Sequence, residues 1–394
     1  MLVAVYIPTF LLSMGQGILI PTLPLYAQTY VPSFALVSIV VAASGIGTLL
    51  ADVPVGMALQ RAGRKPLMLV GTALVAVFTL TLAFAQTYPE LLAFRFLAGI
   101  GNAMWGISRM AYIAEVVPIE DRGRAISSFG GINRIGTFVG PAVGGIIGAQ
   151  FGLHIPFIVT SLLAFCALGI AQAFVVEPPG HGLARGAMRW RKVGEIARRQ
   201  YQDLATAGAA QVFAAMIRSG RQIIIPLYGA SVVGLDVAQV GTIISIAAAI
   251  DMSLFVPAGL LMDRLGRKFA SVPSFLIMGV GMGLVPLAGD YAGLLLATSV
   301  MAFGNGIGSG TMMTLGADLA PKEATGEFLG LWRLIGDIGQ TSGPMVVGAL
   351  GDIFGLSIAA FSLAGIGALA AVTLALFVRE TLTAGDASVH RVAS

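Results

Sequence analysis

Residues 54–65 read Pro-Val-Gly-Met-Ala-Leu-Gln-Arg-Ala-Gly-Arg-Lys, and residues 257–268 read Pro-Ala-Gly-Leu-Leu-Met-Asp-Arg-Leu-Gly-Arg-Lys. Each stretch ends a long apolar segment with a basic turn that contains glycine. The two stretches are 203 residues apart (259 − 56). The same offset aligns further positions: Asn102 with Asn305, Glu115 with Asp318, Pro118 with Pro321, Gly140 with Gly343, Pro141 with Pro344, and Gly145 with Gly348. The chain therefore contains one unit of about 200 residues twice.

The composition indicates a protein that is surrounded by lipid. Of its 394 residues, 57% are hydrophobic and 11% are charged, and the mean hydropathy is +0.89. Soluble domains have about 25% charged residues, so this chain has too little polar surface to face water on all sides. A single cysteine, Cys166, excludes an internal disulfide, and three scattered histidines predict neither a metal site nor a cofactor.

The apolar segments are long enough to cross a bilayer as helices, which takes about 20 residues each. They lack the alternation of a membrane β-barrel, so we expect an all-α membrane protein. The twelve predicted spans are roughly 3–28, 35–59, 67–86, 89–114, 125–150, 154–176, 204–230, 237–262, 270–289, 291–317, 327–351 and 354–378.

Lysine and arginine set the orientation of these spans. The connections after odd-numbered spans carry neither residue, whereas the other connections and the C-terminal tail carry 17. The positive-inside rule then places both termini in the cytoplasm, and we expect a plasma (inner) membrane. Both basic turns fall on the inner side, so the two units are parallel repeats of six spans. The predicted parts are a bundle at 1–176, a linker at 177–203, a bundle at 204–380 and a cytoplasmic tail at 381–394.

The linker is basic and amphipathic, which is typical of a segment lying on an anionic membrane surface. Anchoring by positive charge alone is the simpler interpretation of the same residues.

Ionisable side chains inside spans are costly and are therefore functional candidates. Arg218 and Asp251 lie at similar depth on consecutive spans, so we expect them to face each other, and Arg333 and Asp337 share one helix face. Six cations against three anions predict a wet cavity or an anionic ligand; packing ion pairs are the alternative, above all for Arg109 and Arg134. The nine residues are Asp52, Arg95, Arg109, Arg134, Arg218, Arg221, Asp251, Arg333 and Asp337.

Span 5 carries a strip of glycines at every fourth position, which lets another helix approach closely. A proline inside the strip removes one backbone hydrogen bond and bends the helix. Ordinary packing of small residues is the alternative interpretation. The residues concerned are Gly136, Gly140, Pro141, Gly144, Gly145 and Gly148.

The two basic turns resemble the G-x3-D-R-x-G-R-R/K signature of the major facilitator superfamily, and the likeness extends over the whole chain. The resemblance implies the fold of that family, twelve helices in two six-helix halves, and a conformational role for the signature positions. These are Gly56, Gln60, Arg61, Gly63 and Arg64 in the first copy, and Gly259, Asp263, Arg264, Gly266 and Arg267 in the second.

Two further motifs place the chain near one branch of the family. Arg95 resembles the span-4 arginine that the family links to proton coupling. The run from Gly136 to Gly145 is similar to the span-5 antiporter motif of proton-driven drug exporters. One position departs from the signature: Gln60 stands where the family has an aspartate thought to latch the halves together. Asp52, two turns deeper on the same helix face, is our candidate to take part of that role.

The resemblance implies a secondary transporter that works by alternating access, with spans 1, 4, 7 and 10 lining a central cavity. We expect Asp251 to exchange its proton for substrate beside Arg218, with Asp52 and Asp337 as the next candidates. The expected cavity residues are Gln16, Asn102, Trp105, Arg218, Arg221 and Asn305.

The function predicted is proton-coupled export of a small amphipathic drug or metabolite by a monomer, with no nucleic-acid partner. Uptake or exchange of a small organic anion is the alternative, because positive charge is in surplus within the spans. A non-transporting membrane scaffold is the alternative of a different class, but a scaffold has no need of nine intramembrane charges. We predict no enzyme, because no catalytic cluster or motif is present.

Overall fold

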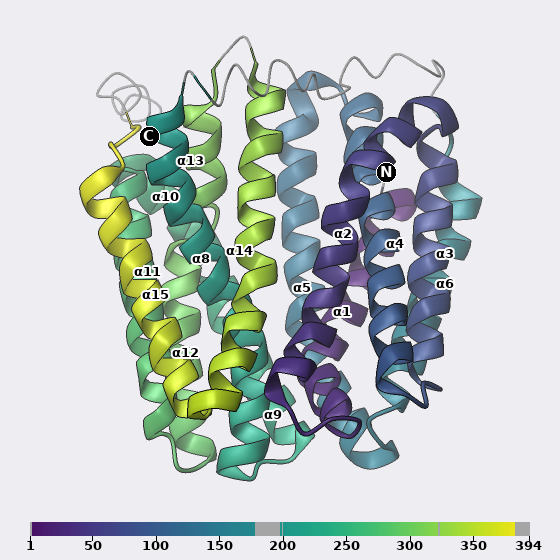
Figure 1. The fold of residues 1–394 in the computed structure, drawn as a ribbon. Helices are drawn as coiled ribbons and strands as arrows, with labels where there is room; N and C mark the ends of the chain where they lie inside the picture. Colours follow the sequence, from purple (N-terminus) through teal and green to yellow (C-terminus); the bar gives the residue numbers. More distant parts are fainter. Residues whose placement is uncertain (1, 178–197, 199, 322–323, 383–394) are drawn as a thin grey trace. The chain divides into compact units, whose positions relative to one another are not determined.

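The computed structural model describes residues 2–177, 198, 200–321 and 324–382. Every regular element in these ranges is a helix (Figure 1). Most of the predicted linker and tail lies outside the described residues, and so do the side chains of Gln60 and of several residues between 119 and 127.

The helices follow the predicted spans closely. The first repeat contains η1 (Leu2–Tyr6), α1 (Ile7–Gln28), α2 (Phe34–Ala62), α3 (Arg64–Leu82), α4 (Tyr88–Val116), α5 (Ile119–Phe151) and α6 (Ile155–Phe174). The second contains α8 (Tyr201–Tyr228), η2 (Gly229–Val233), α9 (Val237–Ser253), α10 (Phe255–Leu265), α11 (Arg267–Leu284), η3 (Val285–Leu287), α12 (Tyr291–Ile307), α13 (Thr311–Leu319), α14 (Thr325–Phe354) and α15 (Leu356–Phe377).

Among the described residues, eight helical segments are long and apolar enough to cross a membrane, and the bent pair α9–α10 makes a ninth. The other long helices, α5, α8 and α14, are the ones that carry Arg134, the pair Arg218 and Arg221, and the pair Arg333 and Asp337. Five of the nine intramembrane charges thus lie in these three helices, and the other four lie in α2, α4 and α9. The chain is a multi-pass membrane protein.

The chain divides into two compact units. The first contains residues 1–187 and Gly229–Ser245, and the second contains Met188–Tyr228 and Ile246–Ser394. Within the first unit α1 packs on α5 and α6, and α3 on α4 and α6. Within the second, α8 packs on α14 and α15, and α11 on α12 and α15. These four pairs of the first repeat thus recur at the equivalent positions of the second, as expected for a duplicated six-helix bundle.

The glycine strip of α5 packs against α1. A Cβ atom at Gly140 would lie 2.5 Å from the carbonyl oxygen of Met14 and 2.6 Å from the Cα of Gly17. Real Cβ atoms do not approach backbone this closely, so only glycine allows this helix spacing. In the second repeat Gly343 of α14 approaches α8 in the same way: a Cβ atom at this position would lie 2.5 Å from the carbonyl oxygen of Met216.

The other face of α5 contacts the beginning of α9 within the first unit. The hydroxyl of Ser245 accepts a hydrogen bond from the N–H of Ala142 and donates one to the carbonyl of Phe138, both at 2.8 Å. These groups flank Pro141, whose missing N–H opens the helix at this turn. A side chain from α9 therefore bridges the opened turn.

Two of the predicted spans, 237–262 and 291–317, contain an interruption within the helix. Span 10 stops at Ile307 and restarts at Thr311, because Gly310 adopts a left-handed conformation (φ 80°) that does not continue a right-handed helix. Span 8 bends by 41° at Leu254, three residues before Pro257. The equivalent Pro54 lies within the continuous α2, so proline weakens the helix without breaking it alone.

Candidate functional site

Three polar side chains from three helices form a chain of hydrogen bonds in the second unit. Nε of Arg218 on α8 donates to Oδ1 of Asn305 on α12 at 2.9 Å. Nδ2 of Asn305 donates to Oδ2 of Asp251 on α9 at 2.7 Å. The structure thus brings together Arg218 and Asp251, predicted to face each other from their depth, but it inserts the amide of Asn305 between them.

Arg221, one turn after Arg218, completes the cluster. Its Nη2 lies 3.9 Å from Oδ2 of Asp251, and the two side chains are 22% and 15% exposed. Arg218 also lies over the ring of Phe275, with its CZ atom 5.0 Å from the centroid, and its Nη2 donates to the carbonyl of Gly308 at 3.2 Å. Both arginines are therefore positioned by contacts within the second unit.

This cluster contains one group that can take up a proton and two cations that keep their charge. Protonation of Asp251 would raise the charge of the cluster by one, and an anionic ligand could offset that charge. Among the described residues no group of three His, Cys, Asp or Glu side chains could hold a metal ion. The side chains of the cluster are able to bind a proton and to attract a charged ligand, and ionisable residues within spans often have such roles.

The predicted cavity residues of the first unit are less closely connected. Asn102, the repeat counterpart of Asn305, has Nδ2 3.4 Å from Oγ of Ser44, and Gln16 is exposed. Trp105 is buried and lies 5.6 Å from the CZ atom of Arg109, which also lies 4.1 Å from the ring of Phe129. Cation–π contacts of this kind hold Arg109 against aromatic rings.

The remaining predicted charges lie on other helices. Asp52 on α2, Arg95 on α4 and Arg134 on α5 are each half-buried in the first unit. Arg333 and Asp337 form an ion pair at 3.6 Å along α14, with 51% and 28% of their side chains exposed.

The basic turn of the first repeat is held by two carboxylates within the first unit. Arg64 is fully buried and forms an ion pair with Glu115 of α4. The carboxylate of Glu177, after α6, accepts hydrogen bonds from the backbone N–H groups of Arg64 (2.8 Å) and Lys65 (2.6 Å). It therefore caps the N-terminus of α3, where the first N–H groups have no partner within the helix.

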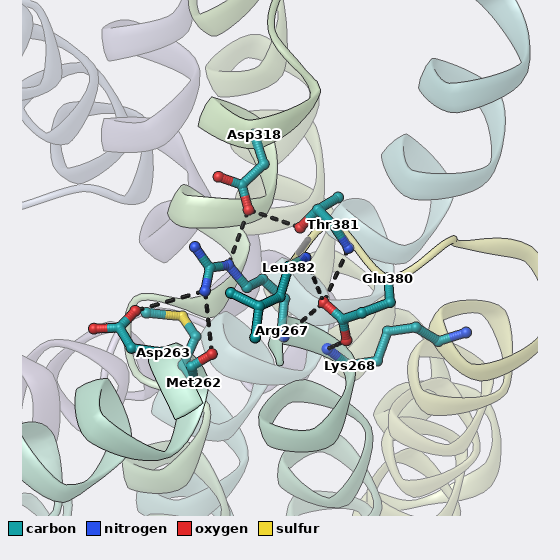
Figure 2. A network of polar contacts seen from close by, with 8 residues as sticks. All are labelled: Met262, Asp263, Arg267, Lys268, Asp318, Glu380, Thr381 and Leu382. Atoms are coloured by element: carbon teal, nitrogen blue, oxygen red, sulfur yellow. Dashed lines mark hydrogen bonds and ion pairs between the residues drawn. The ribbon is translucent and has the colours of Figure 1, made fainter. Parts of the chain in front are cut away.

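The second basic turn repeats this arrangement, as Figure 2 shows. Glu380 accepts hydrogen bonds from the backbone N–H groups of Arg267, Lys268, Thr381 and Leu382, at 2.9–3.0 Å. The guanidinium of Arg267 forms ion pairs with two carboxylates: Nε lies 2.9 Å from Oδ2 of Asp318, and Nη1 lies 3.6 Å from Oδ1 of Asp263. Its Nη1 also donates a hydrogen bond to the carbonyl of Met262 at 3.1 Å.

Glycine is required at each turn because the chain has a positive φ there, 86° at Gly63 and 111° at Gly266. Glu177 and Glu380 were not among the residues predicted from the sequence, although both fit the repeat offset (380 − 177 = 203). Extending the repeat register past span 6 would have found them.

The pKa of Glu380 is lowered. Partial burial raises this pKa, but the hydrogen bonds from the backbone N–H groups of Leu382, Lys268, Arg267 and Thr381 together lower it by more. We expect Glu380→Gln to lower the melting temperature near neutral pH by about 2–4 °C, since a capping bond contributes ~1 kcal/mol. The stabilisation is present above the unfolded-state pKa and is lost as pH falls through the lowered folded-state pKa, so the difference from wild type should shrink in acid.

Thermal unfolding in detergent between pH 4 and 8 measures this effect. Glu177→Gln is the matched comparison and should cost less, because the residues equivalent to Thr381 and Leu382 are Pro178 and Pro179, which have no backbone N–H to donate. Equal melting of both variants and wild type at every pH would contradict the capping role.

Comparisons with known proteins agree with this architecture. The family model of the Major Facilitator Superfamily matches residues 5–333 and 207–391. The chain is 25% identical to an uncharacterized MFS-type transporter of Methanocaldococcus jannaschii, over 90% of this chain and 92% of the relative. It is 24% identical to multidrug resistance protein 2 of Bacillus subtilis, over 66% of each. A crystal structure of a D-xylose-proton symporter has the same fold, with a TM-score of 0.76, 19% identity, and coverage of 95% and 97%.

Proposed function

Because the chain belongs to the Major Facilitator Superfamily and is a membrane transporter, not an enzyme, we propose that it exports a small amphipathic drug or metabolite in exchange for protons. Transport proceeds by alternating access, as in other transporters built from parallel repeats. The observation that carries this proposal is Asp251, a carboxylate within a span that is bonded to Asn305 and lies beside Arg221. Such a group can hold a proton on one side of the membrane and release it on the other.

The direction of transport is supported by the resemblance of span 5 to the antiporter motif and by the similarity to a multidrug resistance protein. Gly140 and Gly144 of this motif pack directly on the backbone of α1. In this proposal the protein lies in the plasma membrane as a monomer with both termini in the cytoplasm.

A second candidate function, uptake or exchange of a small organic anion, is favoured by the charge of the cluster. Arg218 and Arg221 face the single carboxylate of Asp251. Such a site attracts a carboxylate or phosphate more strongly than a cation. The two functions share the cluster and differ in the charge of the cargo and in its direction relative to the proton.

Transport into inside-out vesicles distinguishes them. With an acidic lumen, the proposed exporter accumulates its substrate in the lumen while protons leave. A proton symporter for an anion accumulates substrate there only when the bath is acidic instead. The panel should contain anions, neutral compounds and cations of similar size, and vesicles without the protein are the control. Accumulation of none of them under either gradient would contradict both functions.

A further inference from the structure

The break in span 10 lies next to the polar cluster. The carbonyl of Gly308 accepts hydrogen bonds from Nη2 of Arg218 at 3.2 Å, from Oγ1 of Thr311 at 2.8 Å and from the N–H of Thr311 at 3.2 Å. Within a membrane a free carbonyl is costly, so irregular backbone persists only where other groups satisfy it. The guanidinium of Arg218 is therefore part of what holds the break.

The amide of Asn305 joins this break to Asp251, and its orientation is determined at both ends. Arginine can only donate, so Oδ1 must face Arg218; an ionised carboxylate can only accept, so Nδ2 must face Asp251. Asn305 is 9% exposed and lies one turn before Gly308 on α12. The contacts thus run without a gap from the carboxylate to the broken helix.

The first repeat serves as an internal comparison. The positions equivalent to Arg218 and Asp251 are Gly15 and Thr48, while Asn102 keeps the amide. In that repeat α4 runs unbroken from Tyr88 to Val116. The broken span thus occurs in the repeat that has the charged residues and also has Gly308 and Gly310, where the first repeat has Trp105 and Ile107, and the amide alone does not produce it.

We infer that Asn305 is a positioning residue that transmits the protonation state of Asp251, through Arg218, to the break in span 10. This inference rests on the proposed function, in which Asp251 gains and loses a proton. The charged groups that face Asp251 are Arg221 and, through Asn305, Arg218, both from α8; α12 contributes the neutral amide.

The coupling follows from the hydrogen-bonding capacity of each group. A proton from water that binds either oxygen of Asp251 leaves the other oxygen able to accept from Nδ2 of Asn305, but it removes the negative charge. A hydrogen bond to the neutral acid is about half as strong as one to the carboxylate. The hold of Asp251 on Asn305, and through it on Arg218, therefore weakens, and the donor that Arg218 gives to the Gly308 carbonyl is held less firmly.

Hydrogen exchange of the backbone in 306–314, measured by mass spectrometry at one fixed pH, tests this inference. Asp251→Asn serves as the neutral form of the carboxyl group, and we expect it to speed exchange in this segment by about tenfold, because a charge-assisted hydrogen bond becomes a neutral one of about half the strength. Asn305→Leu should speed exchange to a similar extent by itself. The double variant should exchange no faster than the faster single variant, because both changes break the same chain.

Asn102→Leu, the repeat counterpart in the unbroken α4, is the matched control and should leave 306–314 unchanged. If Asn305→Leu does not fold, Asn305→Ser provides the same comparison with a smaller change. Exchange within about twofold of wild type in Asp251→Asn, or multiplicative effects in the double variant, would overturn the inference. The measurement needs no substrate or gradient, so its failure is distinct from failure of the transport assay.

Discussion

Replacing Asp251 with asparagine is expected to abolish proton-driven accumulation of substrate while leaving exchange of substrate for substrate intact. Asparagine has nearly the same size and still forms hydrogen bonds with Asn305, but it cannot release or take up a proton. Accumulation in liposomes with an imposed pH gradient should fall at least ~10-fold, because the coupling group itself is missing. Counterflow, in which unlabelled substrate inside drives entry of labelled substrate, should stay within about threefold, since it needs only the conformational change.

A matched substitution separates loss of the proton site from loss of a charge. Asp203 lies near the beginning of α8 and pairs with Arg379 at 3.3 Å, with the two side chains 33% and 72% exposed. Exposed pairs contribute about 0–1 kcal/mol, so Asp203→Asn should leave both assays near wild type. Full retention of driven accumulation by Asp251→Asn would show that another group carries the proton.

Much of the fold could be predicted from the sequence because lipid imposes strong constraints on composition. Long apolar segments, the distribution of lysine and arginine, and the repeat offset together predicted twelve spans and the all-α class. The family was predicted from the resemblance of the two basic turns to its signature. The break at Leu254 could not be predicted from Pro257, because Pro54 occurs at the equivalent position of an unbroken helix. At Gly308–Gly310 the second repeat has glycines where the first has Trp105 and Ile107, but glycine permits a left-handed conformation without requiring it. Whether such a residue breaks a span depends on which neighbouring groups can satisfy the freed backbone.

The candidate site was predictable in outline. Depth along the spans placed Arg218 and Asp251 together, because a helix rises by a fixed ~1.5 Å per residue. The position of the Asn305 amide between Arg218 and Asp251 depends on how α12 is rotated about its axis. The depth of a residue along its span contains no information about this rotation. The capping roles of Glu177 and Glu380 were not predicted because both residues lie just after an apolar span. A glutamate at such a position is typical of ordinary surface charge.

Replacing Gly140 or Gly343 with alanine is expected to be strongly destabilising, although alanine is the better helix former. The new Cβ would lie 2.5 Å from the carbonyl oxygen of Met14 in the first case and of Met216 in the second. Each pair of helices would have to move apart, at a cost of about 1–3 kcal/mol, which lowers the melting temperature by roughly 2–10 °C.

Gly106 on α4 is the matched control, because a Cβ atom there would meet nothing within 4 Å. Alanine at this position removes only the conformational freedom of glycine, so Gly106→Ala should stabilise by about 0.5–1 kcal/mol. The same glycine-to-alanine change should therefore lower the melting temperature at positions 140 and 343 and raise it at position 106. Unfolding of purified protein followed by tryptophan fluorescence decides between them. If Gly140→Ala and Gly343→Ala melt at or above the wild-type temperature, close backbone contact is not what holds α5 to α1 and α14 to α8.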